Sequence, residues 1–254
     1  MSSFENHPWM WLPITCLAAF TLIECGARLR KRLQISFEEE RQDQVSRISN
    51  DLMILLSLLL GFTLAMAVPR YDHRRELVVE EANAIGTTWL RAGTLPQPAQ
   101  SRVRDLLRQY VDARLQFADA GFDSARISAA EARSKSLQNQ LWSECMLAIQ
   151  NDRSAVTGAF MLTLNDTIDL DAKRLEAFEN RIPNTIWFLI FFISGLTSLA
   201  FGFTLRTRFW FPMLILPLMM AAVICLIADL DTSRGGTIRV SQESMRRLQA
   251  DLSH

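Results

Sequence analysis

Four long blocks of apolar residues constrain this chain more than any other feature of its sequence. They cover residues 9–27, 52–68, 186–205 and 209–228, and the first contains a single carboxylate, Glu24. A helix needs about 17–25 apolar residues to cross the roughly 30 Å hydrocarbon core of a bilayer. A soluble domain would instead spread its apolar residues along one stripe of each helix. The sequence therefore predicts an all-α membrane protein with four transmembrane helices arranged as two pairs.

The blocks divide the 254 residues into four parts. Residues 1–69 are predicted to be a first membrane part, and residues 184–228 a transmembrane hairpin whose turn is residues 206–208. Residues 70–183 are predicted to be a water-soluble helical bundle inserted between spans two and three, and residues 229–254 a tail that packs on it. The 27 basic and 27 acidic residues cancel. This balance gives no basic field that would favour nucleic acid as a partner.

The basic residues beside the first span predict an orientation. Residues 28–32 contain four basic side chains, whereas residues 1–8 contain no lysine or arginine. Cytoplasmic loops carry the excess of lysine and arginine in membrane proteins. The N-terminus, the bundle and the C-terminus lie on one side, because an even number of spans separates them. The charge asymmetry predicts that this side is the outer one.

Apolar residues recur at three- and four-residue steps through the bundle and predict four helices. The first helix continues from span two, and the second begins near residue 98. The third is expected to begin at a capping box formed by Ser128 and Glu131, and the fourth at Val156. In the tail, residues 237–240 suggest a short strand and residues 241–252 a helix. The residues expected to point inward from the third and fourth helices include Leu137, Leu141, Cys145, Phe160 and Leu164. Val156, at the start of the fourth helix, is expected to point inward as well.

The sequence contains no pattern typical of a catalytic, metal or cofactor site. The three histidines are far apart, and no metal-binding His or Cys motif, nucleophile elbow or phosphate-binding glycine loop is present. Asp166, Asp169 and Asp171 could offer oxygen ligands to a hard cation. A single helix rarely supplies the six or more oxygens that calcium takes, so a solvated helix face is the preferred interpretation. We expect no enzymatic activity, no metal and no cofactor.

Small residues lie on one face of span two. Ser57, Gly61 and Ala65 recur at four-residue steps. Such a face lets helix backbones approach closely, either within one chain or between chains, and packing is the preferred interpretation. A smooth, uncharged face can also line a hydrophobic constriction that closes by dewetting. In that second interpretation, Ser57, Gly61, Leu64 and Ala65 line a pore.

Charged residues follow span two directly where it leaves the lipid. The candidate vestibule residues are Arg70, Tyr71, Asp72, Arg74, Arg75 and Glu76. If several copies surround a pore, rings of arginine at this level favour anions. The alternative is that these residues anchor the helix at the interface and form charge pairs along it.

Two regions contain strings that together resemble a known family. Span two is followed by Tyr71-Asp72-x-x-x-Glu76 and by Glu-Glu-Ala-Asn-Ala-Ile-Gly-Thr at residues 80–87. Span four is followed by Asp-Leu-Asp at residues 229–231 and by Arg-Gly-Gly-Thr-Ile-Arg-Val at residues 234–240. These strings, and the layout of spans around a helical domain, resemble the bacterial bestrophin-like integral membrane proteins.

The resemblance extends more distantly to the bestrophins, which are pentameric anion channels whose second span lines a hydrophobic neck. Tyr71, Asp72 and Glu76 match the residues that lie just beyond that neck. The resemblance implies a multi-pass protein of the bacterial inner membrane that forms homo-oligomers, as pentamers, and conducts anions along span two. The acidic calcium-binding run of animal bestrophins is absent. Bestrophin soluble domains are cytosolic, which opposes the orientation expected from charge, so both orientations stay open. The alternative function is a non-conducting sensor or scaffold whose bundle binds a partner or ligand.

Overall fold

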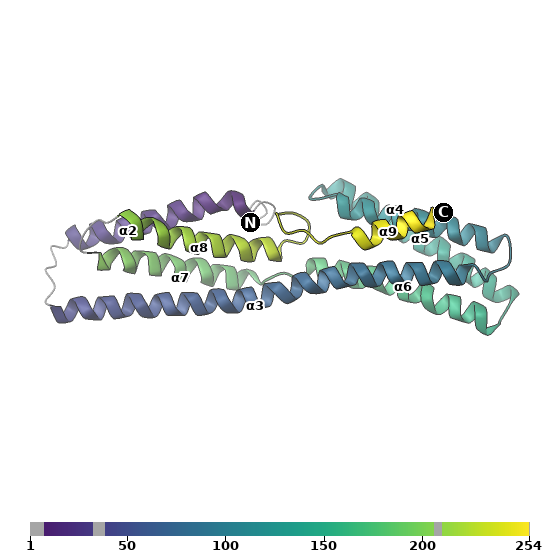
Figure 1. Cartoon of the computed structure of the whole chain (residues 1–254), viewed down its shortest axis with the longest axis horizontal. Helices are drawn as coiled ribbons and strands as arrows, with labels where there is room; N and C mark the ends of the chain where they lie inside the picture. The colour runs from purple at the N-terminus through teal and green to yellow at the C-terminus, as the bar shows by residue number, and fades with distance from the viewer. Residues whose placement is uncertain (1–7, 33–38, 206–209, 254) are drawn as a thin grey trace. The chain divides into compact units, whose positions relative to one another are not determined.

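The computed structural model describes residues 8–32, 39–205 and 210–253, and no strand occurs among them. The predicted all-α fold class is confirmed for this part of the chain. Along the sequence (Figure 1), the elements are η1 (Pro8–Trp11), α2 (Leu12–Arg32), α3 (Glu39–Ala92), α4 (Ala99–Asp119), α5 (Ser124–Asn151), α6 (Ala155–Glu179), α7 (Asn184–Thr204), α8 (Trp210–Asp231) and α9 (Glu243–Leu252). The predicted hairpin turn at residues 206–208 lies outside the described residues.

The chain divides into two compact units. The first comprises Met1–Arg70 and Arg181–Ile238, and the second comprises Tyr71–Asn180 and Arg239–His254. The described helices include four segments long and apolar enough to cross a membrane, as judged by length and composition. These segments are Pro8–Arg32, Asp43–Ala92, Ala155–Thr204 and Met213–Asp231. Each segment covers all or most of one of the four blocks expected from the sequence.

In the first unit, α2 packs closely against α7 through glycines. A Cβ atom on Gly26 would overlap the carbonyl oxygen of Leu199, and one on Gly202 would overlap the carbonyl oxygen of Ile23. Only glycine permits this approach of the two backbones, which is the kind of small-residue packing that holds membrane helices together. Arg30 at the end of α2 donates to the carbonyl oxygen of Thr204 at 2.9 Å, which satisfies a carbonyl in the last turn of α7.

The second unit is a helical bundle around one apolar core. The C-terminal part of α3 contributes Ala82 and Ile85 to it, and α4, α5 and α6 pack around these residues. The predicted inward residues are confirmed: Leu137, Leu141, Cys145, Phe160 and Leu164 are all at most 4% exposed. Burial also raises the pKa of the Cys145 thiol to about 11, so this cysteine is a neutral core residue.

Three details of the predicted elements are wrong. Helix α5 begins at Ser124 and not at the Ser128 box, because Asp123 caps it by accepting from the amides of Ala125 and Arg126 at 3.0 and 3.1 Å. Val156 is 49% exposed, since it lies in the first turn of α6 beyond the packed core. Residues 237–240 form no strand, because Asp229 holds the amides of residues 237 and 238 that a strand partner would take.

The C-terminal tail is divided between the two units. Residues up to Ile238 belong to the first unit, and residues from Arg239 onward belong to the second. There, Met245 and Leu252 of α9 enter the core of the second unit. Arg108 of α4 donates from Nε to the carbonyl oxygen of Leu252 at 2.7 Å, which fixes the end of α9.

Candidate functional site

Helix α3 has one buried side and one exposed apolar side along its membrane segment. Leu56, Leu60, Thr63 and Ala67 are at most 7% exposed and turn toward the rest of the unit. The opposite side carries three large exposed residues: Ile54 at 67%, Leu58 at 52% and Phe62 at 63%. We call the exposed residues of this side, Ile54, Ser57, Leu58, Gly61, Phe62 and Ala65, the α3 strip.

Three of the four predicted pore-lining residues belong to this strip. Ser57, Gly61 and Ala65 are exposed, whereas Leu64 is half-buried at its edge. A Cβ atom on Gly61 would meet nothing within 4 Å. This glycine is therefore not required by packing inside one chain, unlike Gly26 and Gly202.

The predicted vestibule residues do not all lie on the surface. Asp72, Arg75 and Glu76 are exposed, while Arg70 and Tyr71 are half-buried. Arg74 is only 3% exposed. The sequence places three arginines near the end of span two, but the fold turns one of them into the protein.

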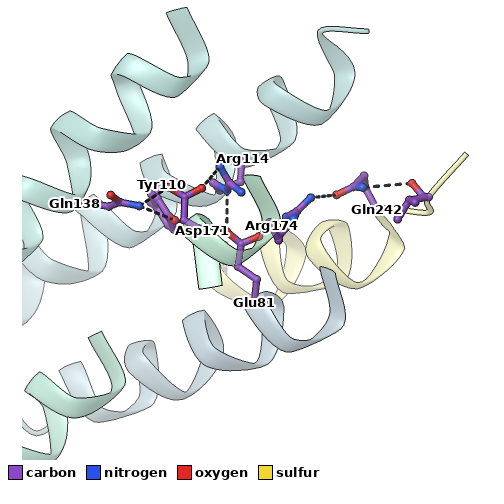
Figure 2. A network of polar contacts seen from close by, with 8 residues as sticks. Glu81, Tyr110, Arg114, Gln138, Asp171, Arg174 and Gln242 are labelled. Atoms are coloured by element: carbon purple, nitrogen blue, oxygen red, sulfur yellow. Dashed lines mark hydrogen bonds and ion pairs between the residues drawn. The ribbon is translucent and has the colours of Figure 1, made fainter. Parts of the chain in front are cut away.

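The second unit contains a buried ion network, which is shown in Figure 2. At its centre is Glu81 of α3, which is fully buried. Arg114 of α4 donates from Nε to Glu81 Oε1 at 2.7 Å, and Arg174 of α6 donates to Oε2. Arg114 also forms an ion pair with Asp171 of α6. Two guanidinium groups and two carboxylates thus neutralise one another between three helices.

Uncharged side chains complete this network on two sides. Tyr110 donates its hydroxyl to Glu81 Oε1 at 3.5 Å, and Gln138 of α5 donates to Tyr110 at 3.2 Å and to Asp171 at 2.7 Å. On the other side, Arg174 donates from Nη2 to Gln242 Oε1 at 3.2 Å, just before α9 (Figure 2). The network therefore links α3, α4, α5, α6 and the tail within one unit.

Electrostatics fixes the charge state of the network. Burial opposes ionisation of Glu81, but the charges of Arg174 and Arg114 outweigh it and hold the pKa of this carboxyl below its usual value. For Tyr110, burial and the charge of Glu81 both raise the pKa of the phenol, which therefore stays neutral. Desolvation would lower the pKa of Arg114, but Glu81 raises it. The ionised groups balance, so the network holds helices together and offers no free charge to a substrate.

The sequence contains a signal for this network. Glu81 lies within the family-specific string but on the same helix side as the inward residues Val78 and Ile85. Arg114 lies three positions after the inward residue Val111 and therefore on the same side of α4. Charged residues inside an apolar stripe are almost never left unpaired, so such positions indicate buried partners.

The three aspartates considered as a cation site do not meet. Asp171 faces the network, whereas Asp166 and Asp169 are exposed, and Asp169 accepts from the amide of Asn165 at 3.0 Å. Among the described residues, no group of three or more His, Cys, Asp or Glu side chains could hold a metal ion.

The motif that follows span four has a structural role in the first unit. Asp229 is fully buried and accepts from Trp9 Nε1 at 2.9 Å and from the amides of Thr237 and Ile238 at 2.8 and 3.2 Å. Gly236 has a φ of 77°, and a Cβ atom there would overlap Asp229 Oδ1, so the loop needs glycine. Asp231 accepts from the amide of Ile182 at 3.0 Å. These two carboxylates therefore accept hydrogen bonds from backbone amides and stabilise the local fold.

These features define an all-helical integral membrane protein with apolar spans and a separate helical bundle. The family model for the Bestrophin-like domain matches residues 15–245, and the chain belongs to this family. The resemblance found from the sequence strings is thereby confirmed.

Solved structures agree with this assignment. The fold is similar to that of a bacterial bestrophin homologue from Klebsiella pneumoniae whose crystal structure was phased by Zn-SAD. The two chains are 13% identical over 96% of each, with a TM-score of 0.67. Two single-substitution variants of that homologue are also similar, each over 96% of this chain. One gives a TM-score of 0.68 at 13% identity over 97% of its own chain. The other gives a TM-score of 0.71 at 12% identity over 96% of its own chain. At these identities the similarity shows the fold. No curated protein matches this sequence.

Proposed function

We propose that this protein is an oligomeric ion channel whose path is lined by the α3 strip. The observation that supports this most directly is that the strip turns away from the buried side of α3 and has no packing role in one chain. Four thin spans cannot enclose a pore within one chain, so conduction requires several copies. Family membership supports a homo-oligomer, which the resemblance suggests is a pentamer in the bacterial inner membrane.

The composition of the strip distinguishes it from the exposed side of α7. Large aromatic residues cover that side, including Phe188 at 69% and Phe192 at 53% exposed, as is suitable for contact with lipid. The α3 strip instead mixes Ser57, Gly61 and Ala65 with its larger residues. Small residues leave room at a narrow passage, and apolar ones allow it to close by dewetting.

The charges beyond the strip set the expected ion preference. An anion preference was expected from three arginines, but Arg74 is buried, so only Arg70 and Arg75 can contribute. The exposed carboxylates of Asp72 and Glu76 oppose them. In a screened vestibule these fields largely cancel. We therefore expect weak selectivity between anions and cations.

Flux measurements on liposomes that contain the full chain test this proposal. Wild-type protein should pass ions in a panel of salts, and Gly61→Leu should reduce the flux about tenfold or more by narrowing the path. The Cβ position of Gly61 is open, so the substitution leaves the fold of one chain intact. Gly158→Leu, which makes the same change at another open glycine position, in α6 of the second unit, is the matched control. Wild-type protein that passes no ion would exclude the channel.

One observation favours a second candidate function, a sensor whose bundle binds a small polar ligand. A groove of about 540 Å³ lies between α4 and α5 and is lined by polar residues, among them Gln109, Asn139 and Gln140. An ion pair between Arg102 and Glu144 at 3.3 Å lies in the groove. Thermal stabilisation of the protein by a polar solute, lost in Asn139→Leu, would support this candidate when flux is absent.

A further inference from the structure

We propose that a pocket among α2, α7 and α8 binds a small amphiphile from the bilayer, namely an aliphatic molecule that carries one hydroxyl group. The pocket has a volume of about 90 Å³. Small side chains from all three helices leave this space, among them Ala19 of α2, Ser194 and Gly195 of α7 and Ala221 of α8, and large apolar residues such as Leu22 and Ile224 complete the walls. This site belongs entirely to the first unit and is separate from the α3 strip.

The pocket lies at the level of the hydrocarbon core. Ser194 is at the centre of α7, and Ala221 is at the centre of α8. At the pocket edge, Ala18 and Phe191 are exposed on the surface that these apolar helices present to lipid. A molecule dissolved in the bilayer can therefore enter without crossing an aqueous phase.

One polar atom in this apolar pocket has no partner. Ser194 is 6% exposed, and its buried Oγ makes no hydrogen bond with any of the described residues. The neighbouring hydroxyls are satisfied within their own helices: Ser198 donates to the carbonyl oxygen of Ser194 at 2.8 Å, and Thr15 donates to that of Trp11 at 2.9 Å. A buried hydroxyl without a partner is unfavourable, so the pocket is incomplete as a packed core.

The volume and the single free hydroxyl together select the ligand class. Water is a poor occupant, because a volume near three water molecules would require two to four polar partners for each. A pure hydrocarbon fills the space but leaves Ser194 unsatisfied. An aliphatic alcohol matches both features, since its oxygen pairs with Ser194 Oγ and its chain lies against the alanines and Gly195.

Photolabelling of the full chain in liposomes tests the site. The probes are an octanol that carries a diazirine and the corresponding octane without the hydroxyl, and labelled peptides are identified by mass spectrometry. The alcohol should label pocket residues of α2, α7 and α8 more strongly than the alkane does. Ser194→Ala should lower labelling by the alcohol about fivefold, as expected for the loss of one hydrogen bond. Thr21→Ala, which removes an exposed hydroxyl of α2 outside the pocket, should leave it unchanged.

A second variant tests the volume. A Cβ atom on Gly195 would lie 3.6 Å from Leu22 Cδ1, an ordinary contact, so Gly195→Ala keeps the fold and takes space from the pocket. It should lower labelling by both probes. Equal labelling by the two probes that is insensitive to Ser194→Ala would show that lipid chains alone fill the space and would overturn the proposal. Absence of label from the three helices would overturn it as well. Neither readout depends on ion flux.

Discussion

In the first unit, α2 and α7 approach until the backbone at Gly202 contacts that at Ile23, and the contact involves no charge. In the second unit, helices of similar length are held by a core that surrounds two buried arginines and two carboxylates. The difference is the one expected if the first unit lies in lipid and the second unit lies in water. Lipid is as apolar as leucine, so close backbone contact must drive association there. In water, apolar burial drives folding, and the buried ions fix which helices pair.

The largest expected effect comes from removing the centre of the ion network. Glu81→Ala leaves Arg174 buried without its carboxylate and Arg114 with Asp171 alone. This change should lower the free energy of unfolding of the second unit by about 3–5 kcal/mol. Thermal unfolding of purified protein, followed by the fluorescence of Trp89 and Trp142, measures this loss. The adjacent Glu80→Ala is the control, because Glu80 is exposed, and it should change stability by less than about 0.5 kcal/mol. Equal effects would contradict the network's role.

The first unit should respond to added volume instead of lost charge. Gly202→Ala forces α2 and α7 apart and should destabilise the first unit by about 1–3 kcal/mol, the usual range for overpacking. Gly61→Ala adds the same methyl group at an open position and should have almost no effect on the stability of one chain. Resistance to proteolysis in detergent compares the two. If both variants resist proteolysis equally, the close contact between the backbones of α2 and α7 would be contradicted.

The comparison also explains what the sequence could predict. The apolar spans and the inward stripes of α5 and α6 were predictable, because each depends only on periodicity within one helix. The Glu81–Arg114–Arg174 network was not, because it depends on which sides of three distant helices meet. The burial of Arg74 was missed for the same reason. Asp229 and Gly236 stood in a recognised motif, but their contact requires a loop geometry that no periodicity encodes.

Acid should weaken the second unit through the network. The pKa of Glu81 is lower in the folded protein than the usual value of about 4.5 for a glutamate, so the ionised carboxylate contributes stability above that value. This contribution is lost as the pH falls below about 4.5 toward the folded pKa. Unfolding measured between pH 7 and pH 3 should show a decline that is steeper in wild type than in Glu81→Gln, which cannot titrate. Parallel profiles would assign acid sensitivity to other carboxylates.

The smallest expected effect concerns charge at the end of span two, where burial separates two neighbouring arginines. Arg75 is exposed and Arg74 is 3% exposed. If the proposed channel conducts, Arg75→Glu should move the reversal potential in a salt gradient by a few millivolts toward cation preference, because an exposed charge in a screened vestibule changes local ion concentrations only modestly.

Arg74→Glu places a carboxylate in the protein interior, so it should lower stability and yield of folded protein before it changes selectivity. Asp72→Lys, at an exposed acidic position nearby, should shift the potential in the opposite direction to Arg75→Glu. A selectivity shift from Arg74→Glu in stable protein, with none from Arg75→Glu, would contradict this assignment and show that Arg74 faces the path.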